Sequence, residues 1–211
     1  MINLNSAQNT ATIILAAGSS SRLGKPKQLL HYQHESLIKR VVKTALQIAS
    51  ENIFVVTGFL HQELVEELSG FPVNFVHNPN WAAGMGTSIK TGIKAVQQSK
   101  NADRFDAVLF LLSDQPLITA EHLNRLTDQF YADKNSMISA TTYAGTQGVP
   151  AVFDRSLFPV LEQLSGKGGA GFLFKKYREN LISVPFENAA VDIDTEQDYL
   201  DLIKPEKDSP K

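Results

Sequence analysis

Short apolar runs alternate along the chain with longer segments that are apolar on one side only. Uncharged runs rich in β-branched residues predict strands covered on both faces, at residues 12–17, 53–57, 73–76 and 107–112. Apolar residues at helical spacing predict helices over residues 37–49, 60–68, 85–96 and 119–132. Strands separated by helices predict parallel pairing with right-handed crossovers, so ligands should gather at the carboxyl ends of the strands.

The second half of the chain has a less regular pattern. Strands are predicted over 137–142 and 148–153, joined by a polar turn around 144–146, and a further strand over 181–184. Helices are predicted over 157–164, 172–177 and 196–203, the last with Thr195 as its N-cap. We therefore expect one α/β domain over 11–203, a Rossmann-like three-layer sandwich with a mostly parallel sheet. A polar segment over 1–10 precedes it, and a disordered tail over 204–211 follows it.

Composition limits the kind of partner. The 211 residues are 43% hydrophobic and 20% charged, enough for one domain with a full core, and the net charge is -2. That charge gives no general attraction to nucleic acid or to an anionic membrane. The absence of cysteine excludes disulfides, thiolate metal sites and cysteine nucleophiles. The first ten residues lack the features of an export signal, so we expect a cytoplasmic protein with a small ligand.

The first predicted strand leads directly into a loop suited to binding an anion. Ala16, Ala17 and Gly18 have side chains too small to keep a ligand from the backbone, so consecutive N–H groups can converge on it. The serines at 19–21 add hydroxyl donors, and the cations Arg22, Lys25 and Lys27 follow. The simplest ligand is a polyphosphate. The alternative is a core strand followed by a glycine turn and a solvated basic surface.

Two familiar phosphate-binding loops do not fit this segment. A Walker loop has four residues between its glycines and Ser or Thr after its lysine, whereas five residues separate Gly18 from Gly24 and Pro26 follows Lys25. The dinucleotide spacing G-x-G-x-x-G occurs only at 166–171, after a predicted helix rather than a strand, and we expect a loop there.

Acidic residues stand where predicted strands end. Asp114 follows the most apolar run of the chain, and burying its carboxylate is costly unless a cation such as magnesium pairs with it. The alternative role is that of a turn residue or helix cap. Asp192 and Asp194 are two positions apart, so on an extended segment their side chains face the same way and repel unless a cation lies beside them. They could also be ordinary solvated acids before the last helix.

The segment 15–30, L-A-A-G-S-S-S-R-L-G-K-P-K-Q-L-L, resembles the signature loop of the MobA-like nucleotidyltransferases. By pattern it is most similar to the molybdenum-cofactor cytidylyltransferases. The resemblance implies that a nucleotide is held by Leu15, Ala16, Ala17 and Gly18. It also implies that Arg22 and Lys27 contact the phosphates during transfer and are catalytic together with Asp114.

Two further segments extend the resemblance. Residues 78–88 match the family pattern N-P-x-W-x-x-G-M-x-x-S, which cradles the base and sugar, so we expect nucleotide contacts from Gly84, Gly86 and Ser88. Trp81 alone would as readily fill a gap in the core. The sequence L-S-D-Q-P matches the magnesium motif, which implies Mg²⁺ on Asp114, and D-I-D-T implies Asp194 as the second metal ligand.

The resemblance implies transfer of a nucleotidyl group to a phosphorylated acceptor such as molybdopterin. Ala17 points to CTP, because L-A-A-G is similar to the cytidylyl branch and L-A-G-G to the guanylyl branch. The chain departs from the molybdopterin pattern at 148–151, G-V-P-A instead of G-H-P-V, and at 166–171, G-K-G-G-A-G instead of G-D-x-G-A-R. Two alternatives stay open: a sugar- or polyol-phosphate nucleotidyltransferase, and a non-catalytic carrier that serves a molybdoenzyme or its maturation factor.

Overall fold

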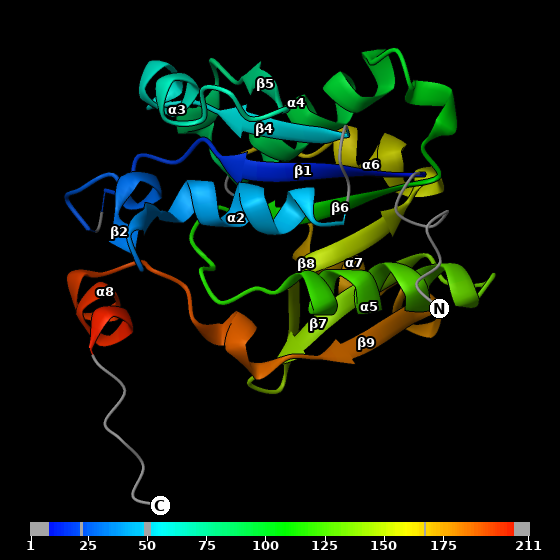
Figure 1. Cartoon of the computed structure of the whole chain (residues 1–211). Helices are drawn as coiled ribbons and strands as arrows, with labels where there is room; N and C mark the ends of the chain where they lie inside the picture. Colours follow the sequence, from blue (N-terminus) through cyan, green and yellow to red (C-terminus); the bar gives the residue numbers. More distant parts are fainter. Residues whose placement is uncertain (1–8, 22, 49–51, 167, 205–211) are drawn as a thin grey trace, which may run out of the picture.

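The computed structural model places seven strands in one sheet, and it describes residues 9–21, 23–48, 52–166 and 168–204. The strand order is β5-β4-β1-β6-β8-β7-β9 (Figure 1). Those strands are β1 (Thr10–Ala16), β4 (Ile53–Thr57), β5 (Asn74–His77), β6 (Ala107–Leu112), β7 (Ile138–Tyr143), β8 (Thr146–Asp154) and β9 (Leu181–Pro185). A short hairpin pairs β2 (His31–Tyr32) with β3 (Glu35–Ser36).

The sheet is mostly parallel. β1 runs parallel to both β4 and β6, and β5 and β9 are parallel to their own neighbours β4 and β7. β8 alone is antiparallel to the strands on both its sides, β6 and β7. The expected α/β sheet is confirmed, with one reversed strand where the β7–β8 hairpin returns the chain.

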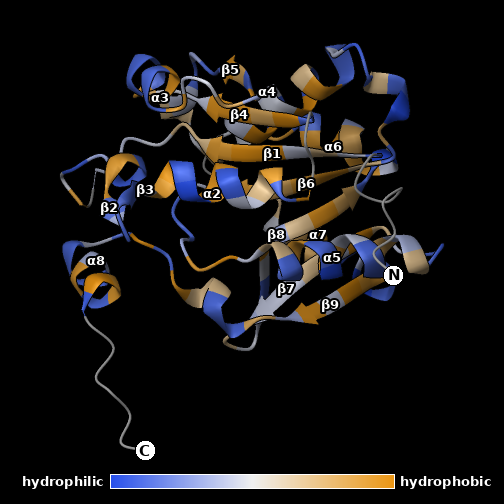
Figure 2. Cartoon of the chain, in the orientation of Figure 1, coloured by the Kyte–Doolittle hydropathy of each residue, from blue (hydrophilic) through white to orange (hydrophobic). Residues whose placement is uncertain are grey.

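Helices cover both faces of the sheet, and this explains why the strand sequences are apolar throughout. Alternate residues of β1 point to opposite sides: Ile14 packs in a core with α2, α3 and α5, and Ile13 packs in a core with α4, α6 and α7. Figure 2 shows the apolar strands enclosed between helices whose outer faces are polar. The helices are α2 (Leu37–Leu46), α3 (His61–Glu67), α4 (Met85–Gln98), α5 (Ala120–Ala132), α6 (Phe158–Glu162) and α7 (Gly171–Lys176). The three-layer sandwich is thereby confirmed.

The last helix, α8 (Glu196–Ile203), lies apart from these layers, beside the β2–β3 hairpin (Figure 1). Thr195 caps it by accepting a hydrogen bond from the Asp198 N–H, and the Asp198 carboxylate accepts one from Thr195 in return, so the predicted cap is confirmed. The Tyr199 hydroxyl donates to the His31 carbonyl at 2.9 Å, which fixes the helix to the hairpin. Asp194 lies two residues before α8, and its N–H donates to Asp198 Oδ2 at 3.1 Å, so the docking of α8 contributes to the position of Asp194.

Some element boundaries differ from the sequence expectation. Helix α2 ends at Leu46, three residues short of Ala49, which lies outside the described residues. Helix α6 spans Phe158–Glu162 instead of the expected 157–164: Leu157 ends a 3-10 turn over Arg155–Leu157, and residues 163–165 have no regular helical structure. The segments expected to be a polar start (1–10) and a disordered tail (204–211) lie mostly outside the described residues.

Candidate nucleotide site

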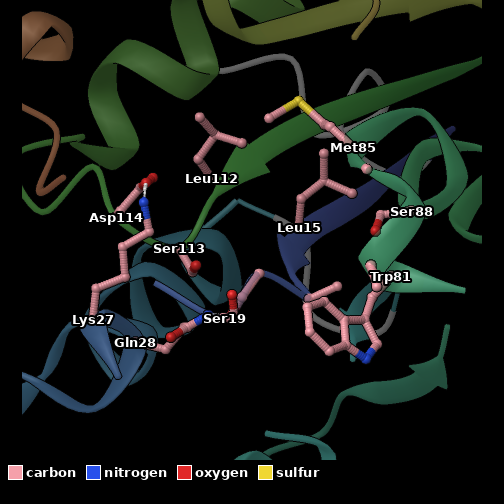
Figure 3. A pocket seen from close by; sticks show the side chains of 14 residues that line it. Leu15, Ser19, Lys27, Gln28, Trp81, Met85, Ser88, Leu112, Ser113 and Asp114 are labelled. Carbon is pink, nitrogen blue, oxygen red and sulfur yellow. Dashed lines mark hydrogen bonds and ion pairs between the residues drawn. The ribbon is translucent and has the colours of Figure 1, made fainter. Parts of the chain in front are cut away.

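A cavity of about 320 Å³ opens at the carboxyl ends of β1 and β6, where the parallel topology predicts a ligand. Figure 3 shows Lys27 and Asp114 pointing toward each other at one end, and Trp81 and Ser88 at the other. The side chains of Leu15, Leu112 and Met85 lie between them (Figure 3). One end of the cavity is therefore charged, and the middle is apolar.

The loop after β1 offers backbone donors to this cavity. Within the described residues, the N–H groups of Gly18, Ser19 and Ser20 donate no hydrogen bond to protein, although Ser19 and Ser20 are only half-exposed. Ser20 has a φ of 55°, in the left-handed region, so the chain turns sharply there. Consecutive N–H groups around such a turn form a concave anion site.

Gln28 holds this loop in shape, a role that no pattern in the sequence indicates. Its side chain is 1% exposed, and Nε2 donates to the carbonyl oxygens of Ala16 at 3.3 Å and Gly18 at 2.8 Å. Its Oε1 accepts from the Ser20 hydroxyl at 3.3 Å. The Ser20 hydroxyl oxygen in turn accepts from the Lys27 N–H at 3.1 Å. Because the carbonyls of Ala16 and Gly18 accept hydrogen bonds from Gln28, the loop presents N–H donors rather than carbonyl acceptors to the cavity.

Lys27 joins two carboxylates from distant parts of the chain. Its Nζ donates a short hydrogen bond to Asp114 Oδ2 and lies 3.0 Å from Asp194 Oδ1. Burial lowers the pKa of Lys27, but attraction to Asp114 and hydrogen bonds to both aspartates outweigh this and raise the pKa above its ordinary value. The side chain is therefore an ammonium at neutral pH.

Negative charge accumulates around this lysine. Burial raises the pKa of the Asp192 carboxyl, and the carboxylates of Asp114 and Asp194 raise it further. Burial also raises the pKa of Tyr143, with Asp192 and Asp114 adding to the effect. One ammonium thus interacts with three carboxyl groups, those of Asp114, Asp192 and Asp194, so a further cation would be stabilised there.

Asp114 fits a metal ion. Its residue is 8% exposed, and its Oδ1 atom is buried without a hydrogen-bond partner in the described residues. A buried carboxylate oxygen without a donor is costly, and a divalent cation would satisfy it. Within the described chain, no group of three or more His, Cys, Asp or Glu side chains is placed so that it could hold a metal ion together. Any ion held by Asp114 and Asp194 would therefore complete its shell with water and phosphate oxygens, as Mg²⁺ commonly does.

The structure brings together most of the residues expected from the sequence. The lining of the cavity includes Leu15, Ala17, Gly18, Lys27, Gly84, Ser88 and Asp114. Asp194 reaches this group through Lys27. Arg22 lies outside the described residues.

Two expected contacts lie elsewhere. Ala16 does not line the cavity, and its carbonyl is bonded to Gln28. Gly86 also does not line it; its N–H donates to the Gly166 carbonyl at 3.1 Å. A Cβ at Gly86 would lie 2.8 Å from the Gly168 carbonyl oxygen, so this glycine permits α4 to pack closely on residues 166 and 168–170, called the glycine loop below.

Trp81 lines the cavity rather than the core. It is half-buried and packs edge-on against Phe59, with ring centroids 5.3 Å apart. Gly58 makes this possible, since a Cβ there would lie 2.6 Å from the Trp81 Cβ. The loop that carries Trp81 is held by the buried side chain of Asn78, whose Nδ2 donates to Ser88 Oγ at 3.0 Å. The aromatic ring is thus presented to a ligand in a fixed position.

The chain resembles known proteins along most of its length. A MobA-like NTP transferase domain matches residues 12–181. The chain belongs to the MobA-like NTP transferase family. It is a nucleotidyltransferase by class, as the resemblance of its loop predicted.

Its relatives within the family carry different names. It is 31% identical to nicotine blue oxidoreductase of Paenarthrobacter nicotinovorans, over 89% of this chain and 93% of that one. It is 29% identical to the molybdenum cofactor cytidylyltransferase of Escherichia coli K12, over 89% and 92% respectively. The crystal structure of Rv0371c from Mycobacterium tuberculosis superposes with a TM-score of 0.76 at 27% identity, over 93% of this chain and 98% of that one. None of the helices in the described ranges combines the length and apolar character that a bilayer span needs.

Proposed function

We propose that this protein transfers a CMP group from CTP to a small phosphorylated acceptor, with molybdopterin as the first candidate and Mg²⁺ as the metal. An oxygen of the acceptor phosphate attacks the α-phosphorus of CTP, the bond from that phosphorus to the β-phosphate oxygen breaks, and pyrophosphate leaves. A phosphate nucleophile is already ionised at neutral pH, so the step needs no general base. Positioning and charge neutralisation supply the catalysis.

The observation that carries the proposal is the pairing of donors and carboxylates around one cavity. The N–H groups of the 18–20 loop and the ammonium of Lys27 would bind phosphate oxygens. Asp114 and Asp194 would hold Mg²⁺, which, when bound, neutralises charge on the reacting phosphates. Arg22 is proposed as a further phosphate contact from the family resemblance.

The base and sugar would occupy the apolar part of the cavity. Ala17 and Trp81 line it, and Ala17 is only 5% exposed. The preference for CTP depends on the single methyl group of Ala17, so Ala17→Gly should shift selectivity toward GTP. Competition of the four nucleoside triphosphates in one assay measures this shift, and unchanged selectivity would remove the argument for CTP.

The acceptor would lie toward the second half of the chain. Gln115 follows Asp114 and donates from Nε2 to the Val149 carbonyl at 3.1 Å, so the G-V-P-A segment adjoins the charged end of the cavity. The glycine loop packs on the start of α4 near Met85. Both segments depart from the molybdopterin pattern, and relatives of similar identity have different names, which keeps a sugar- or polyol-phosphate acceptor as the second candidate.

Pyrophosphate release from CTP, Mg²⁺ and molybdopterin tests the proposal, with a panel of sugar and polyol phosphates as parallel acceptors. Asp114→Asn should lower turnover about a hundredfold or more, because the metal and Lys27 both lose a charged partner. Asp103→Asn, at an exposed position, is the matched control and should leave turnover unchanged. Binding of CTP without pyrophosphate release on any acceptor would favour the carrier function instead.

A further inference from the structure

The position of Lys27 has a consequence for how the metal and the nucleotide bind. Its ammonium lies between Asp114 and Asp194, the two carboxylates proposed to hold the metal. The three side chains are largely shielded from solvent, with exposures of 17% for Lys27, 11% for Asp114 and 30% for Asp194. Without nucleotide, the Lys27 ammonium thus already pairs with the two carboxylates that are proposed to hold the metal.

A divalent ion and this ammonium compete for the same oxygens. Mg²⁺ binds carboxylate oxygens at about 2.0–2.1 Å, so an ion shared by Asp114 and Asp194 would stand next to Lys27 Nζ. Two cations in a shielded place repel each other strongly. The ion can therefore bind well only if the ammonium moves away.

Lys27 is fixed at its base, and the rotatable bonds of its side chain allow Nζ to change partners. Its backbone N–H donates to Ser20 Oγ, and the 3-10 turn Lys27–Leu29 holds its main chain, whereas the four methylenes between them and Nζ can rotate. Its side chain also lines the cavity, next to the donor loop at 18–20. A triphosphate there offers several anionic oxygens within reach of the same ammonium.

We propose that Lys27 is a latch that excludes the divalent metal from Asp114 and Asp194 until a triphosphate draws its ammonium away. This inference rests on the proposed function. A bound nucleotide would then offer phosphate oxygens to the metal and at the same time draw the Lys27 ammonium off Asp114 and Asp194. Because coupling between two ligands is reciprocal, each should raise the affinity for the other.

Titration of Mn²⁺ into nucleotide-free protein, followed by the electron paramagnetic resonance signal of free Mn²⁺, tests the latch. Lys27→Met keeps the unbranched chain as far as Cε and removes the charged Nζ. It should bind Mn²⁺ roughly 5- to 150-fold more tightly than wild type, the usual range of coupling between two sites. Lys94→Met is the matched control, since Lys94 is exposed on α4 and does not line the cavity, and it should bind Mn²⁺ as wild type does.

A second variant locates the gained site. Lys27→Met combined with Asp114→Asn should lose the gain, because the ion then lacks a carboxylate. Equal Mn²⁺ affinity of wild type and Lys27→Met would overturn the latch. If Lys27→Met unfolds without metal, Mn²⁺ should restore cooperative thermal unfolding, and failure to restore it would equally overturn the proposal.

The nucleotide arm distinguishes the latch from simple loss of one positive charge. Mn²⁺ and CTP should enhance each other's binding more in wild type than in Lys27→Met, because only wild type has an ammonium to displace. Equal enhancement in the two proteins would contradict the latch. If CTP does not bind wild type at all, the proposed function fails, while the nucleotide-free Mn²⁺ comparison still decides whether Lys27 excludes the metal.

Discussion

The side-chain nitrogen Nε2 of Gln28 lies 2.8 Å from the carbonyl oxygen of Gly18 and donates a hydrogen bond to it. This bond joins the loop that follows β1 to the 3-10 turn Lys27–Leu29. It occupies a backbone acceptor that would otherwise repel phosphate, and so it determines which groups of the loop face the cavity. The first prediction follows from this contact.

Gln28→Leu keeps the volume of the side chain and removes its donor. The Ala16 carbonyl, in a buried place, and the Gly18 carbonyl, in a part-buried one, then lose their bond to Gln28, and the free energy of unfolding should fall by about 1–3 kcal/mol. The affinity for CTP should fall about tenfold, which corresponds to about one charged hydrogen bond. Urea unfolding and calorimetric titration measure the two effects. Gln97→Leu, on the exposed side of α4, is the control and should show neither.

Gly18→Ala should separate binding from folding. A Cβ at Gly18 meets nothing within 4 Å among the described residues, so the free energy of unfolding should stay within about 0.5 kcal/mol of wild type. The new methyl would stand beside the unpaired N–H groups of the loop, where the phosphate is proposed to lie. CTP affinity should therefore fall tenfold or more by calorimetric titration. Unchanged affinity would place the phosphates elsewhere.

Gly58→Ala should affect both properties. Its Cβ would lie 2.6 Å from the Ala17 carbonyl oxygen and 2.6 Å from the Trp81 Cβ, so the loop after β1 or the Trp81 segment must shift. We expect a loss of about 1–3 kcal/mol in unfolding free energy, together with weaker CTP binding. Tryptophan fluorescence should change as well, since Trp81 is the only tryptophan in the sequence. A variant with wild-type stability and fluorescence would show that the space between Gly58 and Trp81 accepts a methyl group.

His122 should make stability depend on pH. Burial, with a smaller effect of the Arg125 charge, lowers the pKa of His122 to about 4. The imidazole ring of His122 stacks on Phe186, and its Nε2 is hydrogen-bonded to the Thr141 hydroxyl. The folded-state pKa lies below the ordinary value of 6.5, so the unfolded chain binds the proton more readily. The contribution of His122 to the free energy of unfolding is fully present above pH 6.5. It should fall by about 3 kcal/mol as the pH falls to about 4.

Urea unfolding of wild type and His122→Gln between pH 4 and 7 measures this contribution. The wild-type curve should be the steeper one across that range, because only wild type must protonate a buried imidazole. Curves of equal slope would mean that His122 titrates normally in the folded protein.

Much of the fold was predictable because apolar spacing reports burial directly. The strand at 107–112 and the helix from 119 follow from unbroken and periodic apolar patterns, and the structure has β6 and α5 there. The direction of β8 was not predictable in this way. A strand covered on both faces has the same composition whether its neighbours run parallel or antiparallel, and the hairpin turn at Ala144 and Gly145 was the one local sign of reversal.

The site was predictable as a set of residues but less so as a set of contacts. Small residues and cations mark the loop at 16–27. Nothing in the sequence indicates that the Gln28 side chain donates hydrogen bonds to the carbonyls of that loop, or that Gly86 allows α4 to pack closely on the glycine loop. These roles arise from segments that meet only in the folded chain. The same holds for Lys27, which the motif assigns to phosphate and the structure places between two aspartates.

The bond between Lys27 and Asp194 spans 167 positions of the sequence. During synthesis the ribosome therefore completes the donor loop and β6 well before it adds the second carboxylate. A chain that ends before Asp194 contains the donor loop, Lys27 and Asp114 but lacks one of the two proposed metal ligands. The proposed metal site is thus complete only after the C-terminal part of the domain has been added.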